Sequence, residues 1–495
     1  MKHKIICADC IKALNELEDN SIDSCVTDPP YGLEFMDKDW DYNVPSVKVW
    51  SEVFRVLKPG AYLLSFFGTR TYHRGVVNIE DAGFEIKDMI LWIYGSGFPK
   101  SIDISKAIDK ELGKLDERKI IGIKTYPTSK DRTGDKSPFQ AENNHLSAIF
   151  AITSPATPGA QKWQGFGTAL KPACEPIVLA KKPISEHNIA QNVLKWSTGG
   201  LNIEECRIST SDNLNGGMYS EGEHKWANKS HKWGYKRQPG QYKQPKGRFP
   251  ANVILECCCE DSELLEGQAS GSRGHWSKNK VTGYGNFGGG KYEYQGVGKK
   301  DDMRCLIHTN PNCVCRMLDE QSGILQSGGK FGKCYEWEKY HGAVTVFSKV
   351  GMYTASCISD KGGASRFFYQ AKASQNERWF YCKICKQAYP MKERDNHIHN
   401  APDNAKYQHL EFHPTQKPLE LIRYLIRLVT PSHGTMIDLF MGTGTALVAA
   451  EREGFNSIGI DNKLEYCEIA IKRMEEEMKQ LRINREPSTI ERIGF

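Results

Sequence analysis

The stretch that decides the fold reads MIDLFMGTGTALVAAEREGFNSIGIDN and spans residues 436–462. It begins with an apolar run at 436–440, passes through a glycine-containing loop, and continues with apolar residues at helical spacing over 446–453. A second apolar run, 457–460, follows and ends at Asp461. The pattern predicts strand, loop, helix and strand in that order, which is the unit from which parallel α/β sheets are built.

The loop of this unit has the composition of a ligand-binding turn. Gly442 and Gly444 allow the backbone to turn tightly from strand to helix and to approach a ligand closely. Asp438 could accept hydrogen bonds from an amine, and Asp461 stands where nucleotide-binding folds place the acid that binds a ribose diol. The third glycine of a dinucleotide site is missing, so a nucleoside without phosphates fits better than NAD. The alternative is an ordinary strand-to-helix turn followed by an incidental acid.

Both ends of the chain repeat the alternation of strands and helices. The apolar runs lack a polar face, which indicates a parallel sheet covered by helices on both sides. We expect strands at 4–8, 22–27, 61–67, 84–94, 436–440 and 457–460, and helices at 11–17, 47–57, 70–82, 102–112, 418–429, 446–453 and 464–481. Pro59 and Gly60 are expected to stop the second of these helices. The fold class is therefore α/β, with one Rossmann-like sheet formed by both chain ends (1–95 and 410–495) and a large irregular α+β insertion (96–409).

The tetrapeptide Asp28-Pro29-Pro30-Tyr31 closes the expected strand at 22–27. Two consecutive prolines make a rigid loop at the carboxyl end of a strand, where open α/β sheets bind ligands. The Asp28 carboxylate and the Pro29 carbonyl could hold an NH₂ group, and Tyr31 offers a flat face on which a heterocycle can stack. Two acceptors pulling on an exocyclic amine would make its nitrogen more nucleophilic. The alternative is a turn whose prolines only end the strand.

These motifs resemble those of the beta class of S-adenosylmethionine-dependent DNA amino methyltransferases, in which a DPPY-type motif precedes an FxGxGT-type motif. Here residues 28–31 come first, and Phe440-Met441-Gly442-Thr443-Gly444-Thr445 follows far downstream. His413-Pro414-Thr415-Gln416-Lys417-Pro418 is similar to the TxKP element of the family, and Ile6-Cys7-Ala8-Asp9-Cys10 matches its acid near the cofactor adenine. The resemblance covers roughly 1–95 and 410–475.

The resemblance implies direct transfer of a methyl group from S-adenosylmethionine to N6 of adenine or N4 of cytosine in double-stranded DNA, after the base is flipped out of the duplex. The catalytic residues would be Asp28, Pro29, Pro30 and Tyr31. The cofactor would be bound by Asp9, Asp28, Lys417, Asp438, Phe440, Gly442, Gly444, Thr445 and Asp461. Asp in the first position of DPPY favours adenine as a family-level tendency. The rivals are an RNA or protein amide methyltransferase and an inactive DNA-binding protein that keeps the fold.

The insertion contains a segment suited to DNA. From His224 to Pro250 the sequence has no Asp or Glu, but it has eight Lys and Arg residues interleaved with Trp, Tyr and Phe. Cations suit phosphates, and aromatic rings can stack on bases or wedge between them. The alternative is a solvated basic loop. The segment 270–298 is so rich in glycine that we expect it to become ordered only on binding.

The 16 cysteines favour metal sites or buried thiols over disulfides, because no secretory signal is evident and a reducing compartment is expected. Cys382, Cys385, His397 and His399 are predicted to form a tetrahedral structural zinc site, although His-x-His departs from the usual spacing and His409 or His413 could substitute. A second group offers seven ligands, of which no set can be chosen: Cys257, Cys258, Cys259, Cys305, His308, Cys313 and Cys315. The alternative for both groups is a set of free thiols.

Composition limits the class of protein. The chain has 495 residues, with 39% hydrophobic and 25% charged residues, which argues for two or three globular domains and against wholesale disorder. The net charge of +6 is too small to prove a nucleic-acid partner by itself. No run approaches the length of a membrane helix, and we expect a cytoplasmic enzyme with DNA as its partner. A homodimer and a restriction partner are both open.

Overall fold

The computed structural model describes most of both chain ends and parts of the middle. The described residues are 1–32, 43–95, 97, 101–126, 148–210, 245–257, 259, 313–322, 325–327, 360–362, 364–372, 377–397, 399, 407–413, 415–481 and 488–494. They form two compact units. One unit contains 1–95, 174–397 and 410–495, and the other contains 96–173 and 398–409.

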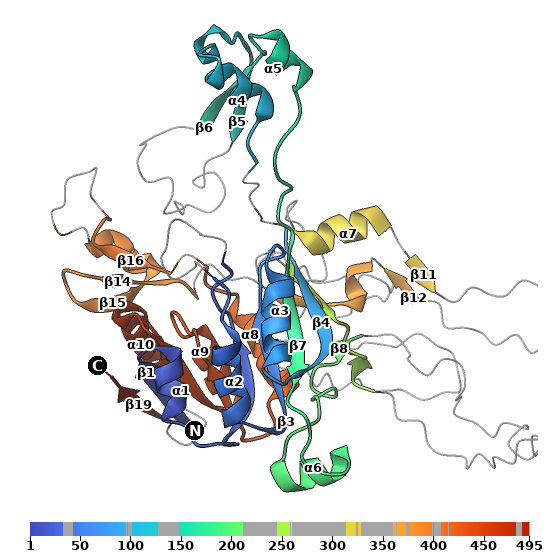
Figure 1. Cartoon of the computed structure of the whole chain (residues 1–495), viewed down its shortest axis with the longest axis vertical. Helices are drawn as coiled ribbons and strands as arrows, with labels where there is room; N and C mark the ends of the chain where they lie inside the picture. The colour runs from blue at the N-terminus through green and yellow to red at the C-terminus, as the bar shows by residue number, and fades with distance from the viewer. Residues whose placement is uncertain are drawn as a thin grey trace, which may run out of the picture. The chain divides into compact units, whose positions relative to one another are not determined.

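The first unit is built around a ten-stranded sheet with the order β13-β10-β4-β7-β3-β2-β17-β18-β1-β19. Its strands are β1 (Lys2–Cys7), β2 (Ile22–Thr27), β3 (Leu57–Phe66), β4 (Glu85–Ile93), β7 (Cys174–Lys181), β10 (Val253–Cys257), β13 (Tyr369–Lys372), β17 (Thr435–Asp438), β18 (Asn456–Asp461) and β19 (Thr489–Ile493). Figure 1 shows strands from the two chain ends, blue and red, side by side in this sheet. The prediction of one sheet formed by both ends is confirmed.

The expectation of an all-parallel sheet is wrong. Strand β7 pairs antiparallel with both β3 and β4, while the other pairs in the described sheet are parallel. Strands β7, β10 and β13 come from the middle of the chain, so that region also contributes to the sheet. A strand can run either way between two parallel neighbours, and its apolar pattern does not reveal the direction.

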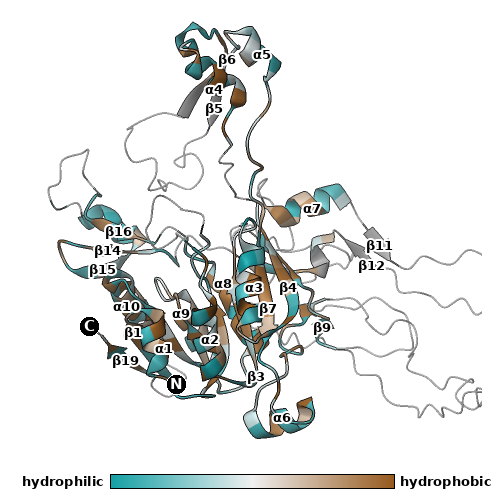
Figure 2. Cartoon of the chain, in the orientation of Figure 1, coloured by the Kyte–Doolittle hydropathy of each residue, from teal (hydrophilic) through white to brown (hydrophobic). Residues whose placement is uncertain are grey.

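Helices cover both faces of the sheet. One face packs against α1 (Cys10–Asn15), α2 (Val47–Val56) and α3 (Tyr72–Asp81). The other packs against α8 (Leu419–Val429), α9 (Thr445–Glu453) and α10 (Leu464–Leu481). Adjacent residues of β3 show the alternation, because Leu63 packs on the first face and Leu64 on the second. Figure 2 colours the strands between these helices mainly as hydrophobic, so the core lies in two layers, one on each side of the sheet.

The expected helix bounds agree with the structure to within a few residues, and the strand at 22–27 and the helix at 464–481 agree fully. Pro59 and Gly60 are the exception. They do not stop a helix but lie inside β3, which begins directly after α2. Gly60 has a φ of +84°, and the Pro59 carbonyl accepts hydrogen bonds from Asn192 Nδ2 and Thr198 Oγ1. The Asn192 and Thr198 side chains therefore bond to the Pro59 carbonyl, which in a regular strand would accept a hydrogen bond from the backbone of the neighbouring strand.

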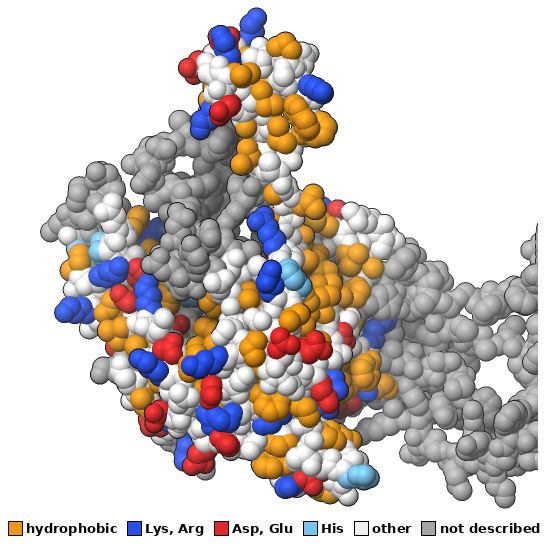
Figure 3. All heavy atoms as spheres, viewed as in Figure 1, with side chains coloured by type: hydrophobic (Ala, Val, Ile, Leu, Met, Phe, Trp, Pro, Cys, Tyr) orange, Lys and Arg blue, Asp and Glu red, His pale blue; other side chains and the backbone are white. Residues whose placement is uncertain are grey.

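Smaller elements complete the first unit. They are α6 (Ile189–Trp196), α7 (Val314–Ser322), the two-stranded sheets β8 (Ile208–Ser209) with β9 (Gly247–Arg248) and β11 (Leu325–Ser327) with β12 (Asp360–Gly362), and the sheet β15-β14-β16 formed by β14 (Trp379–Cys382), β15 (Gln387–Pro390) and β16 (Leu410–Phe412). The outer surface of α1 to α3 carries interspersed acidic and basic side chains on the face drawn in Figure 3. Such mixed charge is typical of a solvated surface.

The second unit is a hairpin with two helices. Strands β5 (Ile120–Tyr126) and β6 (Ala148–Thr153) pair antiparallel, and α4 (Ile104–Glu111) packs against α5 (Pro158–Lys162). The buried Asp109 carboxylate accepts hydrogen bonds from the Ala156 amide and the Thr157 hydroxyl and forms an ion pair with Arg118. None of the helices in the described part of the chain has the length and apolar character needed to span a lipid bilayer.

Candidate active site

The loops that follow β2 and β17 begin side by side. These two strands are parallel neighbours, with Met436 opposite Ser24 and Ile437 opposite Cys25. At their carboxyl ends the Thr27 hydroxyl donates a hydrogen bond of 2.7 Å to Asp438 Oδ1. The tetrapeptide 28–31 and the glycine loop 442–445 therefore leave the sheet from adjacent points, although more than 400 residues separate them in sequence.

Asp28 and Tyr31 lie in a cluster of paired charges. Lys417 Nζ donates to Asp28 Oδ2 at 2.7 Å and lies 3.3 Å from Glu175 Oε2. The Tyr31 hydroxyl lies 2.8 Å from both Asp28 Oδ1 and Glu175 Oε2, and donates its single hydrogen to one of them at a time. Between these two residues, Pro29 is buried and Pro30 is half-buried. The Tyr31 carbonyl accepts a hydrogen bond from the Thr71 hydroxyl at 2.6 Å. The side chains and carbonyl of the loop therefore hold it in place through their contacts with Lys417, Glu175 and Thr71.

The two carboxylates determine the protonation of their partners. Burial of Lys417 lowers its pKa, but Asp28 and Glu175 more than offset this, so the pKa of Lys417 is raised and the amine is charged. Burial, followed by the same two carboxylates, raises the pKa of Tyr31 well above its ordinary value. The phenol therefore stays protonated. One cation lies between two anions, which leaves the cluster with an acidic balance suited to an amine.

Glu175 is a site residue that the sequence analysis missed. It is the second residue of β7 and pairs across the sheet with Trp92, near the end of β4. Because β7 runs antiparallel to its neighbours, its beginning lies at the edge where they end. The sequence analysis looked for acidic residues directly after predicted strands. Glu175 instead lies at the start of β7, a strand that the sequence analysis did not predict.

The glycines of the second loop are required by space and by backbone conformation. Gly442 has a φ of +49° and Gly444 a φ of +77°, in the left-handed region that favours glycine. A Cβ at Gly442 would lie 2.7 Å from His413 Nε2, and one at Gly444 would lie 2.7 Å from the Ala470 Cβ of α10. The loop is thus packed closely on both sides, and its residues 441–445 are all buried.

Arg473 supports this loop from behind and was also missed. Its side chain projects from α10, is 5% exposed, and donates to the Thr443 carbonyl at 2.7 Å and to the Thr445 hydroxyl at 3.1 Å. Burial lowers its pKa to about 10, which still leaves the guanidinium charged near neutral pH. A polar residue on the inner face of an amphipathic helix was the available signal.

Two buried acids lie at the base of the glycine loop. Asp461, at the end of β18, accepts hydrogen bonds from the Gly442 amide at 3.0 Å and the Lys463 amide at 2.9 Å. Burial raises the pKa of Asp461 to about 6. Burial also raises the pKa of Asp438 to about 7, although its hydrogen bonds from Thr27 and Phe440 act in the opposite direction. Both carboxylates are therefore more easily protonated than an ordinary Asp side chain.

A pocket lies between the two loops. It brings together four of the predicted residues, Asp28, Lys417, Phe440 and Thr445, with His413, Thr415 and Met441 among the other lining residues. Burial, followed by the nearby cations, lowers the pKa of His413 to about 3, so its imidazole is neutral. Asp9 is not part of this lining. Its carboxylate caps α1 by accepting from the Ile11 and Lys12 amides, beyond the paired residues Cys7 and Asp461.

Comparison with known proteins agrees with this geometry. The family model for N6/N4 DNA methylases matches residues 22–253 and 290–472. The chain belongs to this family. Its members are S-adenosylmethionine-dependent DNA amino methyltransferases, so the resemblance seen in the motifs is confirmed.

Individual relatives match over shorter stretches. The chain is 36% identical to Type II methyltransferase M.HpaI of Haemophilus parainfluenzae over 121 residues, which is 23% of the chain and 38% of the relative. It is 25% identical to Type II methyltransferase M.HindIII of Haemophilus influenzae over 240 residues, 39% of the chain and 63% of the relative. The matches thus span less than two thirds of these relatives. Among solved structures, the cytosine-N4-specific PvuII DNA methyltransferase aligns over 99% of this chain and 95% of its own with a TM-score of 0.35 and 10% identity.

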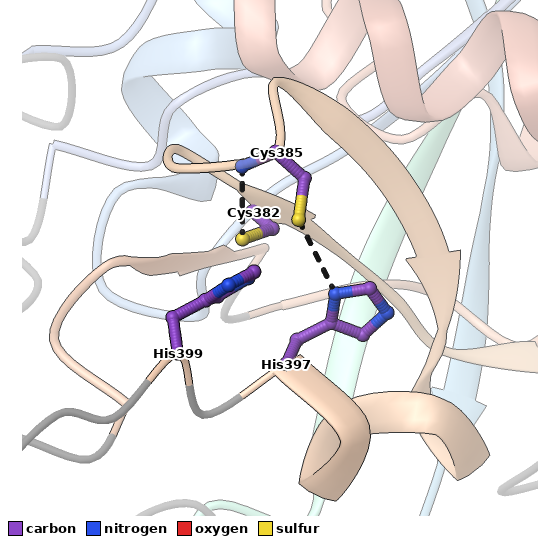
Figure 4. Close-up of side chains that lie close together, drawn as sticks. All are labelled: Cys382, Cys385, His397 and His399. Atoms are coloured by element: carbon purple, nitrogen blue, oxygen red, sulfur yellow. Dashed lines mark hydrogen bonds between the residues drawn. The ribbon is translucent and has the colours of Figure 1, made fainter.

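The chain also contains the predicted Cys and His cluster. Each of Cys382, Cys385, His397 and His399 offers a ligand atom, and these atoms all lie within 4.8 Å of one another. Figure 4 shows the four side chains pointing toward a common centre from the β14–β15 turn and from the segment around His397. Cys385 Sγ lies 3.5 Å from His397 Nδ1, and the Cys385 amide lies 3.5 Å from Cys382 Sγ. His413, a possible substitute, lines the pocket instead.

The predicted DNA-contacting segment lies mostly outside the described residues, as does 270–298. Of the basic and aromatic residues in 224–250, Lys246, Arg248 and Phe249 are described. Lys246 forms an ion pair with Glu205, and the 66% exposed ring of Phe249 lies 6.0 Å from the Arg207 guanidinium carbon. Cys258, Cys305 and His308 of the second cysteine group also lie outside the described residues.

Proposed function

We propose that this protein is a site-specific DNA methyltransferase that transfers a methyl group from S-adenosylmethionine to the exocyclic amine of a flipped base, with N6 of adenine favoured. The observation that carries the proposal is the pocket in which Asp28 and Lys417 face Phe440 and Thr445. Family membership supplies the class of reaction. The geometry supplies a place where the amine that receives the methyl group and a nucleoside-type cofactor would meet.

The glycine loop and its acids fit the cofactor. Gly442 and Gly444 form a tight turn beside which no Cβ fits, and Asp461 lies at the amide of Gly442, where a ribose hydroxyl could share its oxygens. We infer that Asp9, Lys417, Asp438, Phe440 and Thr445 complete the binding site. S-adenosylmethionine, when bound, supplies an electrophilic methyl group. Arg473 holds the loop in place through the Thr443 carbonyl.

The residues 28–31 fit the target base. The Asp28 carboxylate and the Pro29 carbonyl would accept hydrogen bonds from the amine and orient the nitrogen lone pair, while Pro30 keeps the loop rigid. Tyr31 would stack on the base, because its hydroxyl is anchored at Asp28 and Glu175 and its ring position is thereby held. Lys417 keeps the Asp28 oxygen atoms in a defined orientation until the amine arrives. The amine is inaccessible in a duplex, so base flipping is part of the proposal.

A direct test identifies the product. Purified protein is incubated with labelled S-adenosylmethionine and duplex DNA, and the DNA is digested to nucleosides for mass spectrometry. We expect N6-methyladenine. N4-methylcytosine would keep the enzyme class and overturn the adenine preference. Single-molecule sequencing of the same DNA would then locate the recognition sequence.

Two controls separate the rival functions. RNA and protein acceptors offered in competition with DNA would reveal a different substrate if they took up the label preferentially. Cofactor binding without transfer to any acceptor would favour an inactive DNA-binding protein. The site argues against an inactive DNA-binding protein, because Lys417 lies between the Asp28 and Glu175 carboxylates and the resulting acidic balance suits an amine.

We also propose that Cys382, Cys385, His397 and His399 bind one structural zinc ion. Two thiolates and two imidazoles are a common tetrahedral zinc set, and the turn from Cys382 to Cys385 presents both sulfurs to one side. Strand β16 pairs with β14 and leads into His413 and Lys417 of the pocket. Removing this zinc should therefore weaken cofactor binding as well as lower the thermal stability.

Metal analysis tests the site. The variant Cys382→Ser/Cys385→Ser should contain about one zinc ion less per chain than the wild type. The variant His187→Gln changes an exposed histidine far from the cluster in sequence and should keep the wild-type zinc content. Equal zinc in all three proteins would refute the site. A cytoplasmic location and a homodimer remain predictions, the latter open to sedimentation at several protein concentrations.

A further inference from the structure

The second cysteine group forms a small buried core. Five residues make up its buried part, and four of them are cysteines: Cys257, Cys259, Cys313 and Cys315, which together with Leu255 are each at most 2% exposed. Thiols are small and contribute little apolar area compared with Leu or Ile side chains. The partly buried side chains that pack around the thiols are Ile93, Val253, Val314, Leu318 and Phe368.

The chain brings these thiols together from two places. Cys257 ends β10 and Cys259 follows two residues later, a spacing that puts side chains of an extended segment on the same side. Cys313 immediately precedes α7, and Cys315 lies in its first turn. Helix α7 packs against β10, so the two Cys-x-Cys pairs face each other.

The distances fit a metal centre. The sulfur atoms of Cys257, Cys259 and Cys313 lie within 4.8 Å of one another. Cys315 is fully buried beside them, and its thiol donates to the Glu256 carbonyl at 3.9 Å. Zinc binds sulfur at about 2.3 Å, which places the sulfur atoms of a tetrahedron about 3.8 Å apart. Small inward movements of these three sulfur atoms, together with a turn of the Cys315 side chain away from the Glu256 carbonyl, would form the site.

We propose that Cys257, Cys259, Cys313 and Cys315 bind one zinc ion as a four-thiolate structural site, separate from the Cys382 cluster. These four are the members of the group of seven that lie within the described residues. Zinc needs no redox chemistry and accepts four thiolates in a closed tetrahedral site. Binding replaces four buried thiol protons by one cation, with the protons released to solvent.

The position of the site indicates what it does. Strand β10 is parallel to β4, which runs in the same direction as β3 and β2. The cysteines therefore lie at the sheet edge that carries the pocket. The zinc would bind Cys257 and Cys259 to Cys313 and Cys315, and so would fix the end of β10 to the start of α7. If the proposed function holds, this joint lies on the side of the sheet where DNA would meet the enzyme; the zinc site itself does not depend on that function.

Zinc counting on the full-length protein provides the test. We expect about two zinc ions per wild-type chain, and about one in each of the double variants Cys257→Ser/Cys313→Ser and Cys382→Ser/Cys385→Ser. The variant Cys206→Ser removes a buried cysteine outside both clusters and should keep both ions. A zinc content per chain that is lower in the Cys382 double variant than in the wild type, but unchanged in the Cys257 double variant, would overturn the second site.

A second measurement covers a variant that fails to fold. Wild-type protein is treated with an alkylating reagent before and after removal of zinc by a chelator, and the modified cysteines are identified by mass spectrometry. The four thiols should be protected at first and modified afterwards. A linked pair of cysteine peptides that weighs two hydrogens less than the two free peptides would show a disulfide instead. Bound iron together with absorption of visible light would show an iron–sulfur cluster. Either result would refute a zinc site, and neither depends on methyl transfer.

Discussion

The two loops that meet at the pocket are built in opposite ways. The loop after β2 presents side chains, and its Asp28 and Tyr31 are held by Lys417 and Glu175 from distant parts of the chain. The loop after β17 has no charged side chain between Phe440 and Thr445, and its tight turn depends on the positive φ of Gly442 and Gly444. One loop depends on charge and the other on space. Changes of charge should therefore impair the chemistry, whereas added volume should impair ligand binding and stability.

The largest effect is expected from the charged loop. Replacing Asp28→Ala removes an acceptor and leaves Lys417 with Glu175 as its remaining described partner. Methyl transfer should fall by about 100-fold or more, because a positioned group that assists proton transfer contributes 10²–10⁴-fold. Cofactor affinity should change little. The measurement is initial rate with labelled cofactor, alongside binding calorimetry.

The control for this prediction is Asp19→Ala. Its side chain is 67% exposed and pairs with Arg55 at the surface. This variant should transfer methyl groups at the wild-type rate. An active Asp28→Ala protein would exclude Asp28 from catalysis.

The next effect concerns space in the glycine loop. Gly442→Ala places a methyl group 2.7 Å from His413 Nε2 at a φ of +49°. Overpacking of this kind costs about 1–3 kcal/mol, so cofactor affinity should fall by about 10- to 100-fold. Gly454→Ala is the matched control, because its φ of +89° is equally strained but a Cβ there meets nothing within 4 Å. Both variants should lose thermal stability, and loss of affinity in both would contradict the role of space.

A third effect tests the buried acid between the loops. Burial raises the pKa of Asp438 to about 7, so the folded protein binds a proton that the unfolded chain has released above about pH 4. Its contribution to stability is complete below pH 4 and is lost as the pH rises through 7. Between pH 5 and 7 the ligand-free protein should lose about 2 kcal/mol from this group. Thermal unfolding of Asp438→Asn should show a shallower decline over that range, and an unchanged slope would refute it.

A smaller effect is expected at the acid that the sequence analysis missed. Glu175→Gln keeps the shape of the side chain but removes one of the two charges that face Lys417. We expect methyl transfer to fall by about 10-fold, since a hydrogen bond to a charged group contributes about 1.5–3 kcal/mol and the amide keeps part of it. Glu186→Gln, a surface partner of Lys195, is the control. Wild-type kinetics in Glu175→Gln would show that Asp28 alone maintains the cluster.

The smallest effect concerns the bond that joins the loops. Thr27→Val removes the hydroxyl that donates to Asp438 at 2.7 Å and leaves a buried acceptor with one bond fewer. The free energy of unfolding should fall by about 1–2 kcal/mol, whereas Thr27→Ser should stay close to the wild type. Denaturant unfolding of the three proteins measures this. Equal loss in both variants would attribute the effect to packing of the methyl group.

The sequence alone determined the local elements, the order of the motifs and the residues of both loops. Helical and strand periodicities are properties of short stretches, which is why 22–27 and 464–481 were predicted with their observed bounds. Family membership followed from the same local motifs. None of this required knowledge of which strands pair.

Tertiary structure alone decided the direction of β7, and with it the position of Glu175 at the pocket. It also placed Arg473 behind the glycine loop and brought Cys257, Cys259, Cys313 and Cys315 into one buried cluster. These features depend on contacts between residues far apart in sequence. Such contacts are set by how sheets pair and helices pack, because that packing decides which distant side chains share one buried space.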